Sequence, residues 1–95
     1  LLSRESIDAV AELGAKLSNA PTALCRELDI RGGVQVNSIK HGGLLERCRV
    51  REGYIITHIN DKPILTVDDL NRINERITTI DGIYPNGRAS SYTIM

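Results

Sequence analysis

The chain contains no Trp and no Phe, and three tyrosines are the only aromatic residues among its 95. Proteins that hold single-stranded nucleic acid without sequence preference stack the bases on aromatic side chains, so this shortage argues against such a role. Twelve basic residues balance twelve acidic ones. This neutrality provides no broad positive surface for DNA or RNA, and we expect no nucleic-acid partner.

Long hydrophobic runs are also absent. No stretch of the sequence approaches the roughly 20 apolar residues that a membrane-spanning helix needs, so we expect no membrane insertion. The pair Leu1-Leu2 is far too short for the apolar region of a signal peptide. We therefore expect Leu1 to lie inside a longer protein.

Cysteine and histidine are scarce. Cys25 and Cys48 are not at the spacing of a zinc or redox motif, and the isolated His41 and His58 add no ligand pattern. We expect no metal and no cofactor. Because both cysteines lie in apolar contexts, we expect free thiols that pack as small hydrophobic side chains. A disulfide formed in an oxidising compartment is the alternative.

Signatures of catalysis are missing as well. The sequence has no Gly-x-Ser-x-Gly segment, and neither histidine lies in a context that resembles the base of a protease. Asp68 and Asp69 fall in the first turn of an expected helix, where acidic residues complement the helix dipole. We expect the chain not to be an enzyme by itself. The basic run Arg47, Arg49 and Arg51 indicates a solvated loop or, alternatively, a contact with a partner.

Hydrophobic periodicity and turn residues predict strands and helices along the whole chain. Residues 34–39 alternate apolar and polar side chains, and residues 54–59 are rich in β-branched residues. The full prediction is a strand at 13–18, a helix capped by Asn19 that ends near Leu28, strands at 34–39 and 54–59, a helical turn at 44–48, a helix after Thr66 and a hairpin of 82–84 with 88–95. This order favours a small α+β domain with a partly open, mostly antiparallel sheet or barrel.

Two details of this prediction depend on short-range signals. Thr66 with Asp69 three residues later forms a capping box. We expect the helix that follows to carry Val67, Leu70, Ile73, Asn74 and Ile77 on one side. In the hairpin, Asn86-Gly87 predicts a type I′ turn.

A peptide-binding role is favoured by the start of the first strand. A glycine between apolar residues, Gly14, would let backbone N–H groups turn outward. Converging N–H groups capture carboxylates. A free strand edge beside an amphipathic helix accepts an extended peptide through main-chain hydrogen bonds.

Several blocks of the sequence resemble a PDZ domain of the bacterial, circularly permuted type. They are 33–39 with Gly42-Gly43-Leu44, then 50–63, then 66–70. With 12–15 ahead and 83–89 behind, the chain is most similar to the second PDZ domain of Do-like (HtrA/DegP/DegQ) serine proteases of the Bacteroides group. The resemblance implies a PDZ domain over 12–95, preceded by a linker or short helix at 1–11. It implies five or six strands in a partly open antiparallel barrel or sandwich capped by two helices.

The resemblance also implies a function. Proteases of this family work in the periplasm, carry a trypsin-like catalytic domain and assemble into oligomers, and their PDZ domains bind peptide C-termini or unfolded protein segments. The alternative is a structural module that contacts neighbouring protease or PDZ domains of the oligomer. The positions that match the family's binding site are Leu13, Gly14, Ala15 and Lys16 in the carboxylate-binding loop, Leu17 in the strand, and Val67, Leu70, Asn71 and Asn74 in the helix. Leu70 is equally well interpreted as a core residue. Because Glu12 precedes this loop and Ala15 is small, we expect weak binding.

Overall fold

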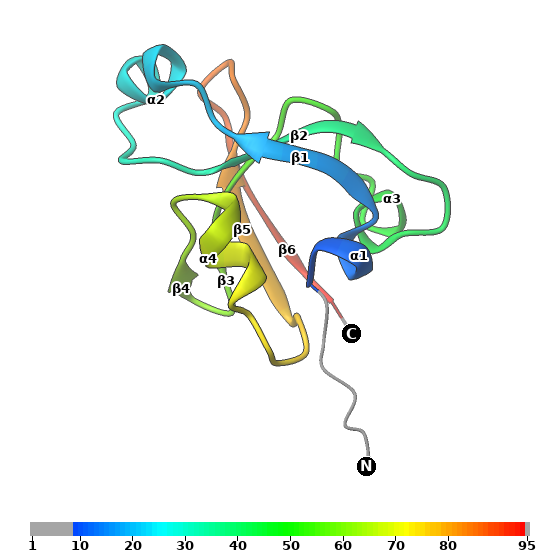
Figure 1. The fold of residues 1–95 in the computed structure, drawn as a ribbon. Coiled ribbons are helices and arrows are strands. Elements are labelled where there is room, and N and C mark those ends of the chain that lie inside the picture. Colours follow the sequence, from blue (N-terminus) through cyan, green and yellow to red (C-terminus); the bar gives the residue numbers. More distant parts are fainter. Residues whose placement is uncertain (1–8, 95) are drawn as a thin grey trace.

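The fold is taken from a computed structural model, and the description extends over residues 9–94. Figure 1 shows a curved sheet with short helices at its ends and along one side. The strands are β1 (Ala15–Asn19), β2 (Val34–Ile39), β3 (Ile55–Ile59), β4 (Lys62–Pro63), β5 (Thr79–Ile83) and β6 (Ala89–Thr93). The helices are α1 (Ala9–Leu13), α2 (Thr22–Leu28), α3 (Leu44–Arg47) and α4 (Val67–Asn71).

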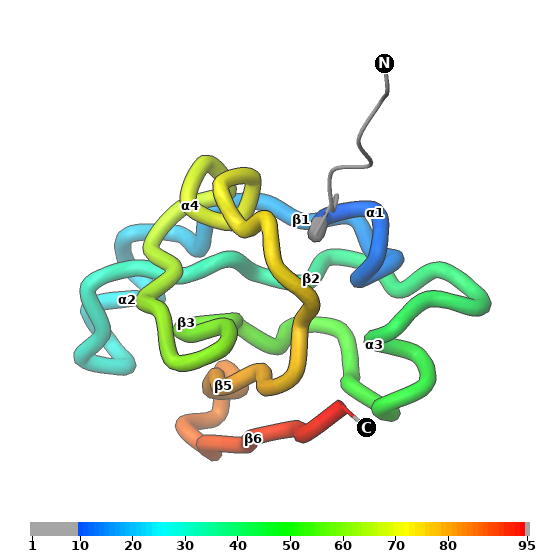
Figure 2. Tube along the Cα trace, turned by 90° about the horizontal axis from the view of Figure 1, so that it is seen from below, coloured from blue at the N-terminus to red at the C-terminus, as the bar shows by residue number. Residues whose placement is uncertain are grey.

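All strand pairs are antiparallel and belong to one six-stranded sheet. The strand order is β1-β2-β3-β5-β6, and β4 pairs with β3 beside this path. Figure 2 shows β1 and β6 on opposite sides of the molecule. The predicted small α+β fold with an open antiparallel sheet is therefore confirmed at this level of description.

The core is aliphatic, as the composition predicts. The two central strands supply much of it, because Val34 and Val36 of β2 and Ile56 and Ile59 of β3 are fully buried. Tyr54 is the exception to the aliphatic pattern, since its ring is buried and its hydroxyl donates to the Ser90 carbonyl oxygen at 2.7 Å. This bond satisfies the one polar atom of a large side chain inside the core.

The helix after Thr66 is shorter than predicted. The capping box is present, with the Asp69 N–H donating to Thr66 Oγ1 at 3.3 Å. However, α4 ends at Asn71, and Ile73 and Ile77 are buried from an irregular segment instead of a helix. The prediction of one continuous helix past Asn71 was therefore wrong.

The side chain of Asn60 explains this early end. Its Nδ2 donates to the Arg76 carbonyl oxygen at 2.8 Å, and its Oδ1 accepts the Thr78 N–H at 2.7 Å. These bonds attach the backbone of residues 76–78 to Asn60, just after β3. Backbone groups that an α-helix would use internally are thus satisfied by a side chain 16 residues away in sequence.

The type I′ turn lies elsewhere than predicted. Asn60 and Asp61, between β3 and β4, both have positive φ, 54° and 66°, as this turn requires. In the β5–β6 hairpin only Gly87 has positive φ, 91°, and its N–H donates to the Tyr84 carbonyl oxygen at 2.8 Å. That geometry is a type I turn with Pro85 at its second position, followed by a left-handed glycine.

Two further predictions concern the first third of the chain. The helix that starts after Pro21 ends at Leu28 as expected, but it has no side-chain cap, because Asn19 bonds elsewhere. Of the predicted linker at 1–11, residues 1–8 lie outside the described part. Residues 9–11 belong to α1, and Val10 packs against the core.

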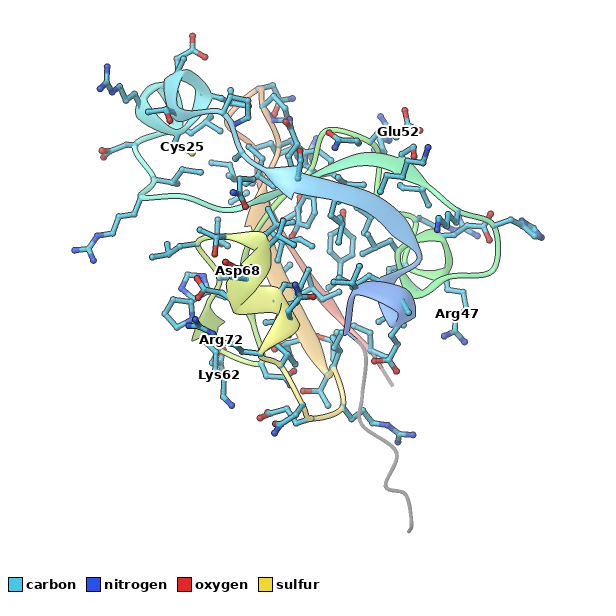
Figure 3. The ribbon with its side chains drawn as sticks, viewed as in Figure 1. Cys25, Arg47, Glu52, Lys62, Asp68 and Arg72 are labelled. Carbon is cyan, nitrogen blue, oxygen red and sulfur yellow. The ribbon has the colours of Figure 1, made fainter. Side chains whose placement is uncertain are left out.

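Both cysteines are free thiols. Cys25 is buried on α2, at one end of β1, as Figure 3 shows. Cys48 is half-buried and directly follows α3, which lies near the other end of β1. The structure therefore agrees with the interpretation as packed thiols and shows no disulfide between them.

Candidate functional site

Strand β1 forms one edge of the sheet. It pairs with β2 alone among the described strands. The Gly14 carbonyl oxygen accepts the Lys40 N–H at 2.8 Å, and the Ala20 N–H donates to the Gly33 carbonyl oxygen at 2.9 Å. Because backbone groups alternate in direction along a strand, those of Ala15, Leu17 and Asn19 face away from β2. They present a row of donors and acceptors at the open edge.

Helix α4 lies beside this edge. Figures 1 and 2 both show it alongside β1, and the two elements are in contact. Asn19 at the end of β1 ties them together, because its Oδ1 accepts the Val67 N–H at 2.8 Å. The first N–H groups of a helix have no partner within the helix, so Asn19 fixes the helix start to the strand. This contact was missed by the sequence analysis, which gave Asn19 to α2.

The other end of β1 is fixed by a contact between two backbones. Gly14 has φ +69°, and a Cβ added to it would lie 2.6 Å from the Gly43 Cα. A Cβ added to Gly43 would lie 2.8 Å from the Leu13 carbonyl oxygen. Only glycine allows this approach, which places the turn between α1 and β1 directly against the start of α3.

The amide of Gly14 does not face outward. Its N–H donates to the Val10 carbonyl oxygen at 3.3 Å and closes the last turn of α1. The carboxylate-binding nest expected from the sequence needs this N–H to be available to a ligand. Since this N–H is already satisfied, Gly14 does not supply the outward donor that was expected of it, and the outward backbone groups of β1 are left for strand pairing.

The predicted site residues fall into three groups by exposure. Leu13, Gly14, Ala15 and Leu70 are buried, with Leu13 and Leu70 at 0% exposure as members of the core. Leu17 of β1 and Val67 of α4 are half-buried and pack against the core. Lys16, Asn71 and Asn74 are exposed. Asn74 lies beyond the end of α4, in the irregular segment.

These positions define a β1–α4 surface, by which we mean the open edge of β1 with the side chains of Leu17 and Val67. Chemically it offers main-chain hydrogen bonds and a small apolar area. Lys16 is the exposed charge of β1, and the exposed Glu12 lies just before the strand, on α1. Such a surface suits an extended apolar segment better than a compact polar ligand.

The two histidines lie outside this surface. His41 Nδ1 lies 3.0 Å from Glu46 Oε2 on the exposed loop before α3. The Gly42 N–H, donating to Glu46 Oε1 at 2.7 Å, and then His41 lower the pKa of the Glu46 carboxyl. His58 is exposed on β3. Across residues 9–94, no three His, Cys, Asp or Glu side chains gather in an arrangement that would hold a metal ion.

Neither a model of a known protein family nor a curated protein matches this chain. Within residues 9–94, every helix falls short of the length and apolar character that crossing a bilayer requires.

Proposed function

We propose that the chain is a peptide-binding module that receives an extended protein segment as an additional strand on β1. The single observation that carries this proposal is the unpaired edge of β1 in contact with α4, with Leu17 of the strand and Val67 of the helix each half-buried against the core. An added strand would use the outward backbone groups of Ala15, Leu17 and Asn19. Its side chains would contact Leu17 and Val67.

The finer assignment of the fold is part of this proposal. We infer that the chain is a PDZ-type domain of the circularly permuted kind. It would be a non-catalytic part of a Do-like serine protease of the periplasm. The sequence blocks described above support the inference, as do the open antiparallel sheet and the helix beside its edge strand. The sequence upstream of Leu1 tests the parentage, since a trypsin-like domain with its serine nucleophile segment is expected there.

Weak binding is expected, because the apolar area is small and the Gly14 amide is occupied. A dissociation constant in the micromolar range or poorer corresponds to about −8 kcal/mol or a less favourable value. The measurement is titration of the ¹⁵N-labelled chain with an apolar peptide, made once with a free C-terminus and once amidated. We expect both forms to shift the amide signals of Ala15, Leu17 and Asn19. Strong preference for the free acid would instead indicate carboxylate capture.

Substitution at Leu17 separates the backbone contribution from the side-chain contribution. Leu17→Pro removes one outward N–H without removing a bond to β2, and proline is tolerated at sheet edges for that reason. We expect it to abolish binding, whereas the matched variant Leu17→Ala, which keeps the N–H, should retain weaker binding. Equal affinity of the two variants would rule out strand addition at this edge.

A further inference from the structure

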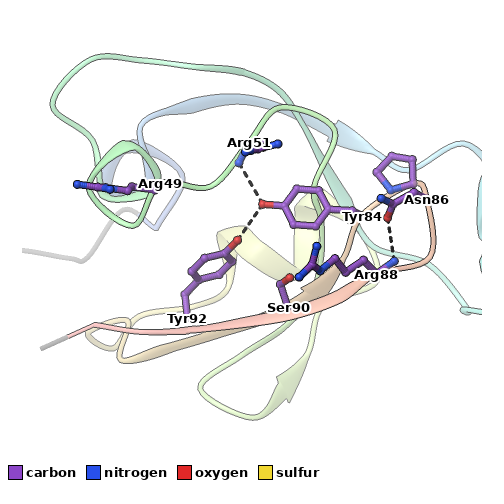
Figure 4. A pocket seen from close by; sticks show the side chains of 8 residues that line it. Arg49, Arg51, Tyr84, Asn86, Arg88, Ser90 and Tyr92 are labelled. Carbon is purple, nitrogen blue, oxygen red and sulfur yellow. Dashed lines mark hydrogen bonds between the residues drawn. The ribbon is translucent and has the colours of Figure 1, made fainter.

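A second surface lies on the opposite side of the molecule, at β6. A cavity of about 520 Å³ opens between β6 and the loop that leads into β3 (Figure 4). It is lined by Arg49, Arg51, Tyr84, Pro85, Asn86, Arg88, Ser90 and Tyr92. Arginine and tyrosine supply most of the polar lining, and none of these described lining residues is acidic. We call this the β6 pocket.

The positive charge of the β6 pocket is uncompensated. Arg49, Arg51 and Arg88 are all exposed, and none of the ion pairs formed among residues 9–94 involves them. The whole chain is neutral, so three arginines around one cavity are a local concentration of charge. Guanidinium groups present their N–H donors in a planar fork that matches a carboxylate or phosphate.

The tyrosine hydroxyls add a hydrogen-bond donor to this cavity. The Arg51 N–H donates to Tyr84 Oη at 3.1 Å, and Tyr84 Oη lies 2.8 Å from Tyr92 Oη. Figure 4 shows these bonds as one chain that runs across the pocket from the loop to β6. Either hydroxyl can donate in the bond between Tyr84 and Tyr92, and whichever donates, the proton of the other hydroxyl is left for a ligand.

The backbone of β6 decides which kind of anion fits. Strand β6 is the other edge of the sheet and pairs with β5 alone among the described strands. The Tyr84 N–H donates to the Arg88 carbonyl oxygen at 2.9 Å, and the Ile94 N–H donates to the Thr78 carbonyl oxygen at 2.8 Å. By alternation, the backbone groups of Ala89, Ser91 and Thr93 face outward. The side chains of Arg88, Ser90 and Tyr92 line the pocket at every second position.

We propose that the β6 pocket binds an extended acidic segment of another protein, with carboxylates at alternate positions. Such a segment can pair with the outward backbone groups of β6 while its carboxylates lie on the pocket side, facing the three arginines. A nucleic-acid backbone lacks the alternating N–H and C=O groups that pair with a strand edge, and the neutral chain gives no broader positive field to hold it. This site needs nothing from the β1–α4 surface and stands independently of the function proposed there.

The test is titration of the ¹⁵N-labelled chain with a fluorescent, N-acetylated and C-amidated peptide of sequence Thr-Glu-Val-Glu-Val-Glu-Thr. Blocking the termini leaves the Glu side chains as the only carboxylates of the peptide. We expect the largest amide shifts at Ala89, Ser91 and Thr93, and weaker binding as salt screens the arginines. The same peptide with Gln in place of Glu is expected to bind at least about tenfold more weakly.

Two matched variants complete the experiment. Arg49→Gln/Arg51→Gln/Arg88→Gln is expected to weaken binding of the acidic peptide by at least about tenfold. Arg26→Gln/Arg31→Gln/Arg76→Gln, which makes the same change in net charge elsewhere, should leave it unchanged. If the first variant loses its native spectrum, Arg88→Gln alone replaces it. Equal loss in both variants, shifts confined to β1, or equally tight binding of an oligonucleotide of the same charge would each overturn the proposal.

Discussion

Strands β1 and β6, at the two ends of the β1-β2-β3-β5-β6 path, offer the same backbone chemistry in different surroundings. Beside β1 lies a helix, and the two elements carry the half-buried aliphatic side chains of Leu17 and Val67. Beside β6 lies a loop, and the side chains there are arginine and tyrosine. Edge strands invite pairing with other chains unless they are covered or charged. Here one edge is flanked by an apolar junction and the other is marked by positive charge.

This difference separates what an edge contributes from what its neighbours contribute. Main-chain bonds supply affinity for any extended segment, whereas side chains select which segment is accepted. A single sheet can thus present two binding edges without competition, because an apolar segment would bind at β1 and an acidic segment would bind at β6. Substitutions at Gly14 and Asn19 test the surroundings of β1, and alkaline pH tests those of β6.

The largest effect is expected from Gly14→Ala. The new Cβ would lie 2.6 Å from the Gly43 Cα, and alanine would have to adopt φ +69°. Both penalties act on backbone that cannot move without displacing α3 or β1. We expect the free energy of unfolding to fall by about 3 kcal/mol, measured by urea denaturation.

Gly42→Ala is the matched control for this variant. Gly42 also has positive φ, +87°, but nothing lies within 4 Å of an added Cβ. Its cost should be limited to the backbone conformation, about 1 kcal/mol. Equal costs for the two variants would mean that the contact between Gly14 and Gly43 does not fix the end of β1.

A smaller effect is expected from Asn19→Ala. The substitution leaves the Val67 N–H without its partner at 2.8 Å, and loss of a helix cap typically costs about 1 kcal/mol. Amide hydrogen exchange should quicken in α4, and peptide binding at β1 should weaken while binding at β6 is unchanged. Asn19→Asp should preserve the bond, because its carboxylate can accept the same N–H. Asn37→Ala serves as the control, because it loses an exposed hydrogen bond to Ser18 Oγ. Unchanged amide exchange of α4 in Asn19→Ala would contradict the capping role of Asn19.

Sequence reasoning succeeded where structure is decided within a few neighbouring residues. The alternation at Val34–Ile39, the β-branched run at Ile55–Ile59 and the Thr66–Asp69 capping box each predicted the observed element. The edge position of β1 is of another kind. It follows from pairing across the chain, and only the resemblance to a family pointed to it.

The errors occurred where a distant side chain decides the backbone. Ile73 and Ile77 continue a helical spacing and are buried, yet Asn60 holds the nearby backbone outside a helix through bonds at 2.7 and 2.8 Å. Asn19 likewise has the residue type of a helix cap but caps the helix 48 positions later. A local pattern cannot indicate which of two helices a capping side chain will reach. The β6 pocket was predicted only in part. The basic run with Arg49 and Arg51 is evident in the sequence, but nothing in the sequence indicates that Arg88 lines the same cavity.

The smallest expected effect concerns alkaline pH and belongs to the β6 side alone. Burial and then the hydrogen bond with Tyr84 raise the pKa of the Tyr92 phenol to about 12, from an ordinary value of 10.0. The unfolded chain therefore releases this proton at lower pH than the folded chain does. The stability that Tyr92 contributes is fully present below pH 10 and is lost as the pH rises from 10 toward 12.

Urea denaturation at a series of pH values above 9, combined with phenolate absorbance, measures this loss. Tyr92→Phe removes the ionisable group but keeps the ring, so its stability should fall less steeply between pH 10 and 12 than that of the original chain. Tyr54, whose pKa is raised by burial and then by Tyr92, remains in both proteins, so its smaller shift in Tyr92→Phe adds to the same difference. Amide exchange should quicken at β6 before β1 as the pH rises. Parallel slopes of unfolding free energy against pH for the two proteins would show that the pKa of Tyr92 is not raised in the folded chain. They would also contradict the hydrogen bond between Tyr84 and Tyr92.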